Sequence, residues 1–169
     1  MSGSGFRPIQ VICLAVMALA GCATSTLFDR ETYDDALTPN DIARSSDAGD
    51  GHQALWGGLI IAARNLEKTS ELEILSYPLD RRQRPDTSRP PQGRFLTVIE
   101  GYLETGDYAE GRMATVAGPV VGKREGKIGE SGYTYPVIET TPEFLHLWPT
   151  GRSETEPRLN FGIGVMFGR

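Results

Sequence analysis

Between residues 54 and 139 the apolar residues fall into short segments separated by glycine and proline, and their period is close to two. The chain has 20 glycines and 11 prolines. Segment 54–65 is apolar on both faces, as in a well-buried strand, segment 69–80 begins with the alternation of a β-strand, and segment 93–104 has the length of a strand with apolar residues on both sides. Segment 111–139 predicts two further strands joined by a turn within 123–129. Five short strands at this spacing predict an all-β fold, either a small antiparallel Greek-key barrel resembling the OB type or a sandwich.

Two of these segments predict a local irregularity. Gly57 and Gly58 lie inside an otherwise apolar strand and indicate sharp curvature or a bulge. In segment 69–80 polar and apolar residues first alternate strictly, and the apolar parity changes from Leu75 onward. This change indicates a bulge or coverage of both faces.

Helical periodicity is nearly absent, and the best candidate is residues 37–47, "LTPNDIARSSD". Thr38 is a suitable N-cap, Pro39 suits the first helical position, and Asp41 suits the first turn. We expect at most two helical turns.

The N-terminus contains an apolar run from Ile9 to Ala20, with Arg7 as the one charge before it. About a dozen apolar residues are too few to cross the hydrocarbon core and are typical of a secretory signal. The residues that follow, "ATSTLFDRETYDDALTPND", are polar and unpatterned, as expected of a tether.

Leu19-Ala20-Gly21-Cys22 resembles the lipobox of bacterial lipoproteins. The resemblance implies cleavage between Gly21 and Cys22 and a Cys22 that carries N-acyl and S-diacylglycerol groups, a palmitate-type anchor. An ordinary signal peptide with an incidental cysteine, a buried helix and a plain membrane anchor are the alternatives. Ala23 stands where an Asp usually retains lipoproteins in the inner membrane, so the resemblance implies the periplasmic face of the outer membrane.

The expected organisation has four parts. Residues 1–21 are the signal peptide, which is removed, and 22–53 are a lipidated tether with a short helix. Residues 54–150 form the β-barrel domain, and 151–169 form a glycine-rich terminal strand or tail. The alternation in "LNFGIGVMFGR" predicts a strand that pairs within the barrel or with a partner, and a disordered tail is the alternative.

An ordered set of short motifs along the domain resembles the Slp family of outer membrane lipoproteins. The set is Trp56-Gly57-Gly58-x-Ile60, Glu73-x-Leu75-x-Tyr77-Pro78-Leu79, Gly93-Arg94-Phe95, Gly101-Tyr102-Leu103, Gly111-Arg112, Thr115-Val116-x-Gly118, Ile128-Gly129-Glu130, Tyr135-Pro136-Val137 and His146-Leu147-Trp148. The resemblance implies an envelope lipoprotein linked to starvation or stationary-phase stress, without an established enzymatic activity.

Charge and chemistry limit the possible functions further. The formal charge is −5, and removal of Arg7 with the signal makes it −6, so we expect no nucleic-acid partner. Of the two cysteines, Cys13 would be removed and Cys22 acylated, which leaves no disulfide. His52 and His146 show no metal-ligand spacing, so we expect no metal, no cofactor and no enzyme.

The expected function is therefore a structural or binding role in the cell envelope. Membrane lipid is the expected partner through acylated Cys22, and an envelope protein or glycan is a further candidate. The alternative function is a periplasm-facing glycan- or protein-binding module of the OB type. Tyr102, Tyr133 and Tyr135 are the candidate binding residues, together with Tyr108, because tyrosines can stack on sugar rings; half-buried sheet residues are the other interpretation.

An arginine cluster lies in the long connection after residue 80, at Arg81, Arg82, Arg84, Arg89 and Arg94. Such a cluster can meet anionic lipid head groups or phosphate. A solvated connection between strands is the alternative, and Asp80 and Asp86 within the cluster favour it.

Overall fold

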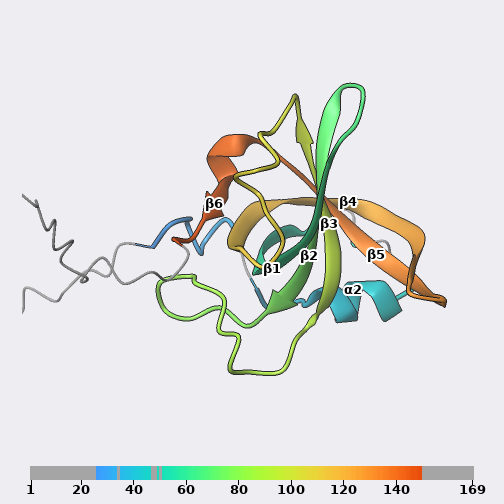
Figure 1. The fold of residues 1–169 in the computed structure, drawn as a ribbon. Coiled ribbons are helices and arrows are strands. Elements are labelled where there is room, and N and C mark those ends of the chain that lie inside the picture. Colours follow the sequence, from blue (N-terminus) through green and yellow to red (C-terminus); the bar gives the residue numbers. More distant parts are fainter. Residues whose placement is uncertain (1–25, 34, 47–48, 50, 150–169) are drawn as a thin grey trace, which may run out of the picture.

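The computed structural model describes residues 26–33, 35–46, 49 and 51–149 (Figure 1). The predicted signal peptide, Cys22 and the tail at 151–169 lie outside these ranges. The elements are α2 (Pro39–Arg44), β1 (Gln53–Asn65), β2 (Thr69–Tyr77), β3 (Gly93–Glu100), β4 (Met113–Ile128), β5 (Ser131–Thr140), the 3-10 helix η2 (Pro142–Phe144) and β6 (Leu145–Leu147).

The strands form one sheet in the order β1-β2-β3-β5-β4-β6, and β1 also pairs with β4. Strands β1 to β5 therefore close into a ring, and β6 pairs antiparallel with the first part of β4 (Figure 1). The order and closure are those of a Greek-key barrel of the OB type. The predicted all-β barrel is confirmed, and the sandwich alternative does not apply. One pairing departs from the predicted antiparallel sheet, because β3 and β5 are parallel over Leu96–Ile99 and Val137–Thr140.

The strand and helix predictions hold with one shift. β4 continues to Ile128, so the hairpin turn lies at Gly129 and Glu130, at the far end of the predicted range and just beyond it. The predicted helix forms as α2 with a reciprocal capping box: Asp41 N donates to Thr38 Oγ1 at 3.2 Å, and Thr38 N donates to Asp41 Oδ2 at 2.9 Å.

Curvature of the barrel is concentrated in β1. The pairing with β2 shifts by one residue between Ile60 and Ala62, which is a bulge close to the predicted glycines. At Gly58 a Cβ atom would lie 1.8 Å from the carbonyl oxygen of Leu75. The backbones of β1 and β2 are therefore so close here that only glycine fits. β2 itself has no bulge in its pairing with β3; Leu75 and Tyr77 are half-buried on its outer face, which is the predicted coverage of both faces.

Apolar side chains fill the barrel, and separate segments cover its two ends. Trp56 and Phe95 meet edge to face at 5.2 Å between ring centroids in the middle of the core. Ile42 of α2 enters this core at one end, and Leu103 and Tyr108 of the loop between β3 and β4 pack against it at the other. Both ends are thus covered, and the outer face of the sheet remains for contact with other molecules.

Candidate functional site

The segment before α2 is fixed to the barrel by paired hydrogen bonds. Phe28 N donates to Gln83 Oε1 at 2.8 Å, and Gln83 Nε2 donates to Phe28 O at 2.7 Å. Gln83 is fully buried, and its own carbonyl accepts from Thr115 Oγ1 at 2.7 Å. Further along, Trp56 Nε1 donates to Leu37 O at 2.7 Å. The second part of the predicted tether is therefore packed against the domain.

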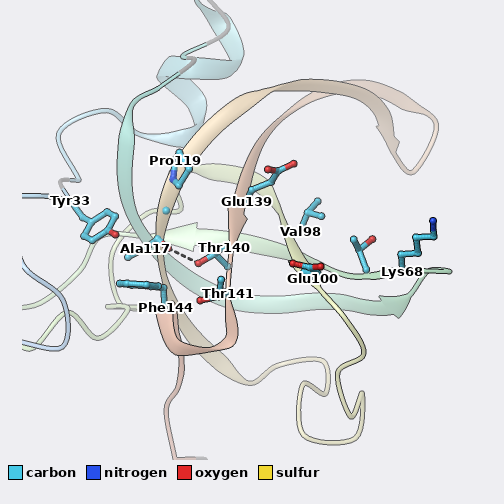
Figure 2. A pocket seen from close by; sticks show the side chains of 12 residues that line it. Tyr33, Lys68, Val98, Glu100, Ala117, Pro119, Glu139, Thr140, Thr141 and Phe144 are labelled. Atoms are coloured by element: carbon cyan, nitrogen blue, oxygen red, sulfur yellow. Dashed lines mark hydrogen bonds between the residues drawn. The ribbon is translucent and has the colours of Figure 1, made fainter.

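A groove of about 580 Å³ lies over the parallel seam between β3 and β5 (Figure 2). The two strands pair over only four positions, which end at Ile99 and Thr140. The residues that line the groove come from the N-terminal segment, the β1–β2 turn, β2, β3, β4, β5 and η2; they are Tyr33, Lys68, Thr69, Val98, Glu100, Ala117, Gly118, Pro119, Glu139, Thr140, Thr141 and Phe144. Its volume is within the range of small-molecule sites.

One wall of the groove is aromatic. The rings of Tyr33 and Phe144 lie 5.8 Å apart at 53°, and Phe28 packs behind Phe144 at 6.1 Å. Phe144 is 37% exposed, whereas Phe28 is half-buried and Phe95 is fully buried. Tyr33 belongs to the segment that Gln83 holds, so the docked segment builds part of the groove.

The rest of the lining combines apolar residues, among them Val98, Ala117 and Pro119, with charged side chains whose net charge is negative. Glu100 and Glu139 are both exposed, and within the described part of the chain neither carboxylate has a hydrogen bond or an ion pair. Lys68 brings the single positive charge of the lining. Val98 is paired with Glu139 across the seam and separates the two carboxylates (Figure 2). The unpaired carboxylates can accept hydrogen bonds from a ligand.

The floor of the groove is rigid backbone. A Cβ atom at Gly118 would lie 2.5 Å from Glu139 O, so β4 and β5 approach closely there. Thr140 Oγ1 donates to Ala117 O at 2.7 Å and ties the same two strands together (Figure 2). A ligand would therefore meet a floor whose shape is already fixed.

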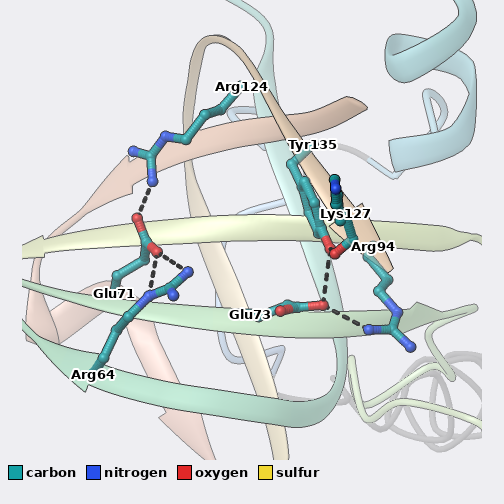
Figure 3. Close-up of polar contacts among 7 residues, drawn as sticks. All are labelled: Arg64, Glu71, Glu73, Arg94, Arg124, Lys127 and Tyr135. Carbon is teal, nitrogen blue, oxygen red and sulfur yellow. Dashed lines mark hydrogen bonds and ion pairs between the residues drawn. The ribbon is translucent and has the colours of Figure 1, made fainter. Parts of the chain in front are cut away.

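Farther along the same outer face, β2 carries two ion-pair clusters (Figure 3). Glu71 is 2% exposed and binds Arg64, whose Nη2 lies 2.6 Å from Oε1, and Arg124 of β4. Glu73 pairs with Arg94 Nη1 at 2.6 Å. Since β4 is no neighbour of β2 in the sheet, the contact between Arg124 and Glu71 fastens the β4–β5 hairpin over this part of the face.

The three predicted binding tyrosines do not form one surface. Tyr135 is 5% exposed, and its hydroxyl lies 3.2 Å from Glu73 Oε1 and 3.1 Å from Lys127 O. Tyr133 is half-buried against Tyr135, and its hydroxyl accepts from Arg94 N at 2.8 Å. Tyr102 is 73% exposed but follows the opposite end of β3. Tyr133 and Tyr135 thus match the interpretation as half-buried sheet residues.

Burial also changes the acidity of two tyrosines. Burial raises the pKa of Tyr135, and the neighbouring charge of Glu73 raises it further. Burial likewise raises the pKa of Tyr108, with a smaller contribution from Asp107. Both phenols therefore remain protonated at neutral pH, and that of Tyr135 donates to Glu73 Oε1.

His146, one of the two histidines noted in the sequence, is packed against a neighbouring ring of the fold. His146 packs edge to face on Trp148 at 4.7 Å in β6, and burial lowers its pKa. Within the described ranges no group of three or more His, Cys, Asp or Glu is arranged to hold a metal ion. The same ranges contain no helix with the length and apolar character needed to cross a membrane.

The arginine-rich connection is only partly solvated. Arg81, Arg82 and Arg89 are exposed, and Arg84 lies over the ring of Trp148 at 5.8 Å. Gln83 between them is fully buried, whereas the sequence predicts nothing special at this position. The acidic N-terminal segment lies against this loop, since Arg30 Nη2 donates to Asp80 O at 3.3 Å. Asp80 and Asp86 lie in the same loop as these arginines, which weakens the case for an anion-binding surface.

Comparison with solved structures yields only distant similarity. A crystal structure of Schizosaccharomyces pombe Pot1pC bound to single-stranded DNA aligns with a TM-score of 0.31 and 11% identity, over 72% of this chain and 91% of that one. The structure of fission yeast Pot1 with single-stranded DNA aligns with a TM-score of 0.29 and 10% identity, over 92% and 49% of the two chains. These scores are too low to carry an argument about fold or ligand.

Comparison with protein sequences is more informative. The chain is 36% identical over 91 residues to the uncharacterized lipoprotein YeaY of Escherichia coli (strain K12), which is 54% of this chain and 47% of YeaY. It is 33% identical over 84 residues to an uncharacterized protein of Haemophilus influenzae, which is 49% and 45% of the two chains. The chain thus spans about half the length of these relatives. The family model of the Slp outer membrane lipoproteins matches residues 19–163, and the chain belongs to this family.

Proposed function

We propose that this outer membrane lipoprotein is anchored through an acylated Cys22 and that its barrel faces the periplasm as a non-catalytic module. The lipobox-like residues up to Cys22 and the Ala at position 23 support the anchor and its address. Two or more acyl chains are needed for stable anchoring, and the processing that the lipobox implies supplies three.

The observation that carries the proposal is that the side chain of Gln83 holds the backbone of Phe28 against the barrel. Phe28 follows Cys22 by six residues, which span about 20 Å when fully extended. An anchor at Cys22 would therefore keep the barrel close to the membrane surface, with the groove wall at Tyr33 a short distance along the chain.

The contacts of several titratable side chains support a non-catalytic role. The carboxylates of Glu71 and Glu73 are paired with arginines, and His146 is packed against Trp148. Ion pairs and ring contacts of this kind stabilise a fold. A structural role or a binding role both fit, and the groove over the β3–β5 seam favours binding of an envelope glycan or protein. A role in starvation or stationary-phase stress follows from the family resemblance alone and belongs to the proposal.

Membrane fractionation with radiolabelled fatty acid tests the anchor. Cys22→Ser should abolish labelling and leave an uncleaved precursor in the inner membrane, because the acylated thiol is missing. Ala23→Asp is the matched control: labelling should persist while the protein moves toward the inner membrane. Normal labelling and outer-membrane recovery of Cys22→Ser would overturn the proposal.

A further inference from the structure

We propose that the groove over the β3–β5 seam binds a neutral saccharide of about two rings. The inference deepens the proposed function, because it assumes a binding role for the barrel and names the ligand class and the site. The rings of Tyr33 and Phe144 would pack on the apolar face of a sugar, and the carboxylates of Glu100 and Glu139 would accept its hydroxyl hydrogens.

The position of the groove in the fold supports a ligand site. Thr69 is paired with Glu100 and Glu71 with Val98, so the groove lies at one end of the outer face of β2 and β3. OB-type barrels bind oligonucleotides or oligosaccharides on this face and on the loop between their first two strands. Lys68 lies in that loop. From Glu71 onward, this face is occupied by the ion-pair clusters and the fastened hairpin.

Charge decides between these two ligand classes. A nucleic acid is held mainly by basic side chains on its phosphates. Here the lining carries two exposed carboxylates and one lysine, and the chain as a whole carries −5. A phosphodiester strand would be repelled, whereas the hydroxyls of a neutral sugar are donors that unpaired carboxylates can bind.

Size and shape argue for a small ligand rather than a polypeptide. A volume of about 580 Å³ accommodates a compound of a few rings. A peptide that binds by strand addition needs an unpaired strand edge. The floor here is formed by β4 and β5, which are already neighbours in the sheet. The rigid floor and the exposed ring of Phe144 instead offer a preformed surface for one sugar ring.

The test uses the full acylated chain, purified in a zwitterionic detergent so that no glycosidic detergent competes. Saturation-transfer difference NMR and calorimetry measure binding of N,N′-diacetylchitobiose, cellobiose and maltose. The expected result is saturable binding of at least one disaccharide, and no binding of a ten-residue oligothymidylate. Failure of all three disaccharides overturns the inference, and saturable binding of trilysine instead would assign the carboxylates to a cationic peptide.

Variants locate the site. Phe144→Ala should weaken disaccharide binding roughly tenfold, the scale of one lost aromatic contact, while Phe144→Tyr should retain it. Tyr102→Ala is the matched control, because its ring is exposed outside the groove. Glu139→Ala should weaken binding several-fold, and Glu130→Ala, an exposed glutamate in the hairpin turn, should not. Equal binding by Phe144→Ala and the unaltered chain places the sugar elsewhere and overturns the inference.

These outcomes separate the inference from the proposed function. Binding is measured on isolated protein, whereas the anchor is tested by labelling and fractionation. A correctly anchored protein without sugar binding refutes only the ligand assignment, and sugar binding by a Cys22→Ser protein that fractionates normally refutes only the anchor.

Discussion

Gln83 and Phe28 are 55 residues apart and form two reciprocal hydrogen bonds through one side-chain amide. The amide of Gln83 binds the N–H and the C=O of Phe28 as a neighbouring strand would. This contact joins the segment nearest the proposed anchor to the loop after β2. Gln83 also has φ of 65°, which for a residue other than glycine indicates a position held by its surroundings.

Replacing Gln83 with Ala should lower the free energy of unfolding by about 2 kcal/mol, because two partly buried backbone groups of Phe28 lose their partners. The released segment should also be cut faster by protease within residues 26–37. Urea unfolding and limited proteolysis measure the two effects.

Gln83→Gly is the informative comparison for that prediction. It removes the same side chain but accommodates the positive φ, so it should destabilise less than Gln83→Ala by about 1 kcal/mol. Equal protease resistance in both variants and the unaltered protein would contradict the assigned role of the amide.

Glu71→Gln should lower the free energy of unfolding by about 2 kcal/mol. The buried carboxylate neutralises Arg64 and Arg124, and an amide of the same shape does not. The cost stays moderate because the arginine side chains are 59% and 48% exposed and can be hydrated.

Arg124→Ala should cost less, since Arg64 still neutralises Glu71, and should speed hydrogen exchange in the β4–β5 hairpin.

The exposed pair of Arg30 and Asp35 provides the control. Its side chains are 41% and 39% exposed, and Asp35→Asn should change stability by less than about 0.5 kcal/mol. A similar loss in Asp35→Asn and Glu71→Gln would show that burial of the carboxylate is not what matters.

The parts of the fold that the sequence predicted depend on local signals. The signal for the helix N-terminus lies within four residues, at Thr38, Pro39 and Asp41, and α2 begins there with the predicted cap. Short apolar segments bounded by glycine and proline were enough to predict five strands, and glycines near a bulge marked where β1 bends. The parallel closure of β3 on β5 joins distant segments, and no short-range pattern encodes it.

The groove could not be predicted for the same reason. Tyr33, Lys68, Glu139 and Phe144 come from four segments, and each looks ordinary within its own. The tyrosine hypothesis pointed elsewhere because alternation does not reveal which face of a hairpin is covered: Tyr135 lies on the face of the β4–β5 hairpin that is turned toward β2, where its hydroxyl donates to Glu73. The sequence analysis did not single out Phe144, because its exposure follows from the fold and not from its neighbours in the chain.

Thr38→Ala should cost about 1 kcal/mol of stability, because Asp41 N loses its capping partner and the reciprocal bond to Thr38 N loses its support. Thr141→Ala is the matched control, since Thr141 precedes η2 without a side-chain capping bond. Thermal unfolding of both variants measures the difference, and equal losses would contradict the energetic role of the cap.

Gly58→Ala should destabilise the barrel by at least about 2 kcal/mol or prevent folding. The new Cβ would overlap the carbonyl of Leu75, and only movement of β1 away from β2 can relieve the contact. At Gly132 a Cβ would meet nothing within 4 Å, and the φ there is ordinary, so Gly132→Ala should be nearly neutral. Circular dichroism and urea unfolding distinguish the two variants, and a stable Gly58→Ala barrel would refute the close approach.

Stability should fall as the pH is lowered from neutral toward 5, in part because of His146. Burial lowers the pKa of His146 below its ordinary value of 6.5, so the unfolded chain takes up the proton first. The stabilisation from the neutral ring is complete above pH 6.5 and is lost as the pH falls toward the folded-state pKa. His146→Gln should therefore show a smaller slope of unfolding free energy between pH 7.5 and 5.5, and NMR titration of the ring should give a midpoint below 6.5. An unchanged slope together with an ordinary midpoint would mean that the ring is hydrated in solution and does not pack on Trp148 as it does here.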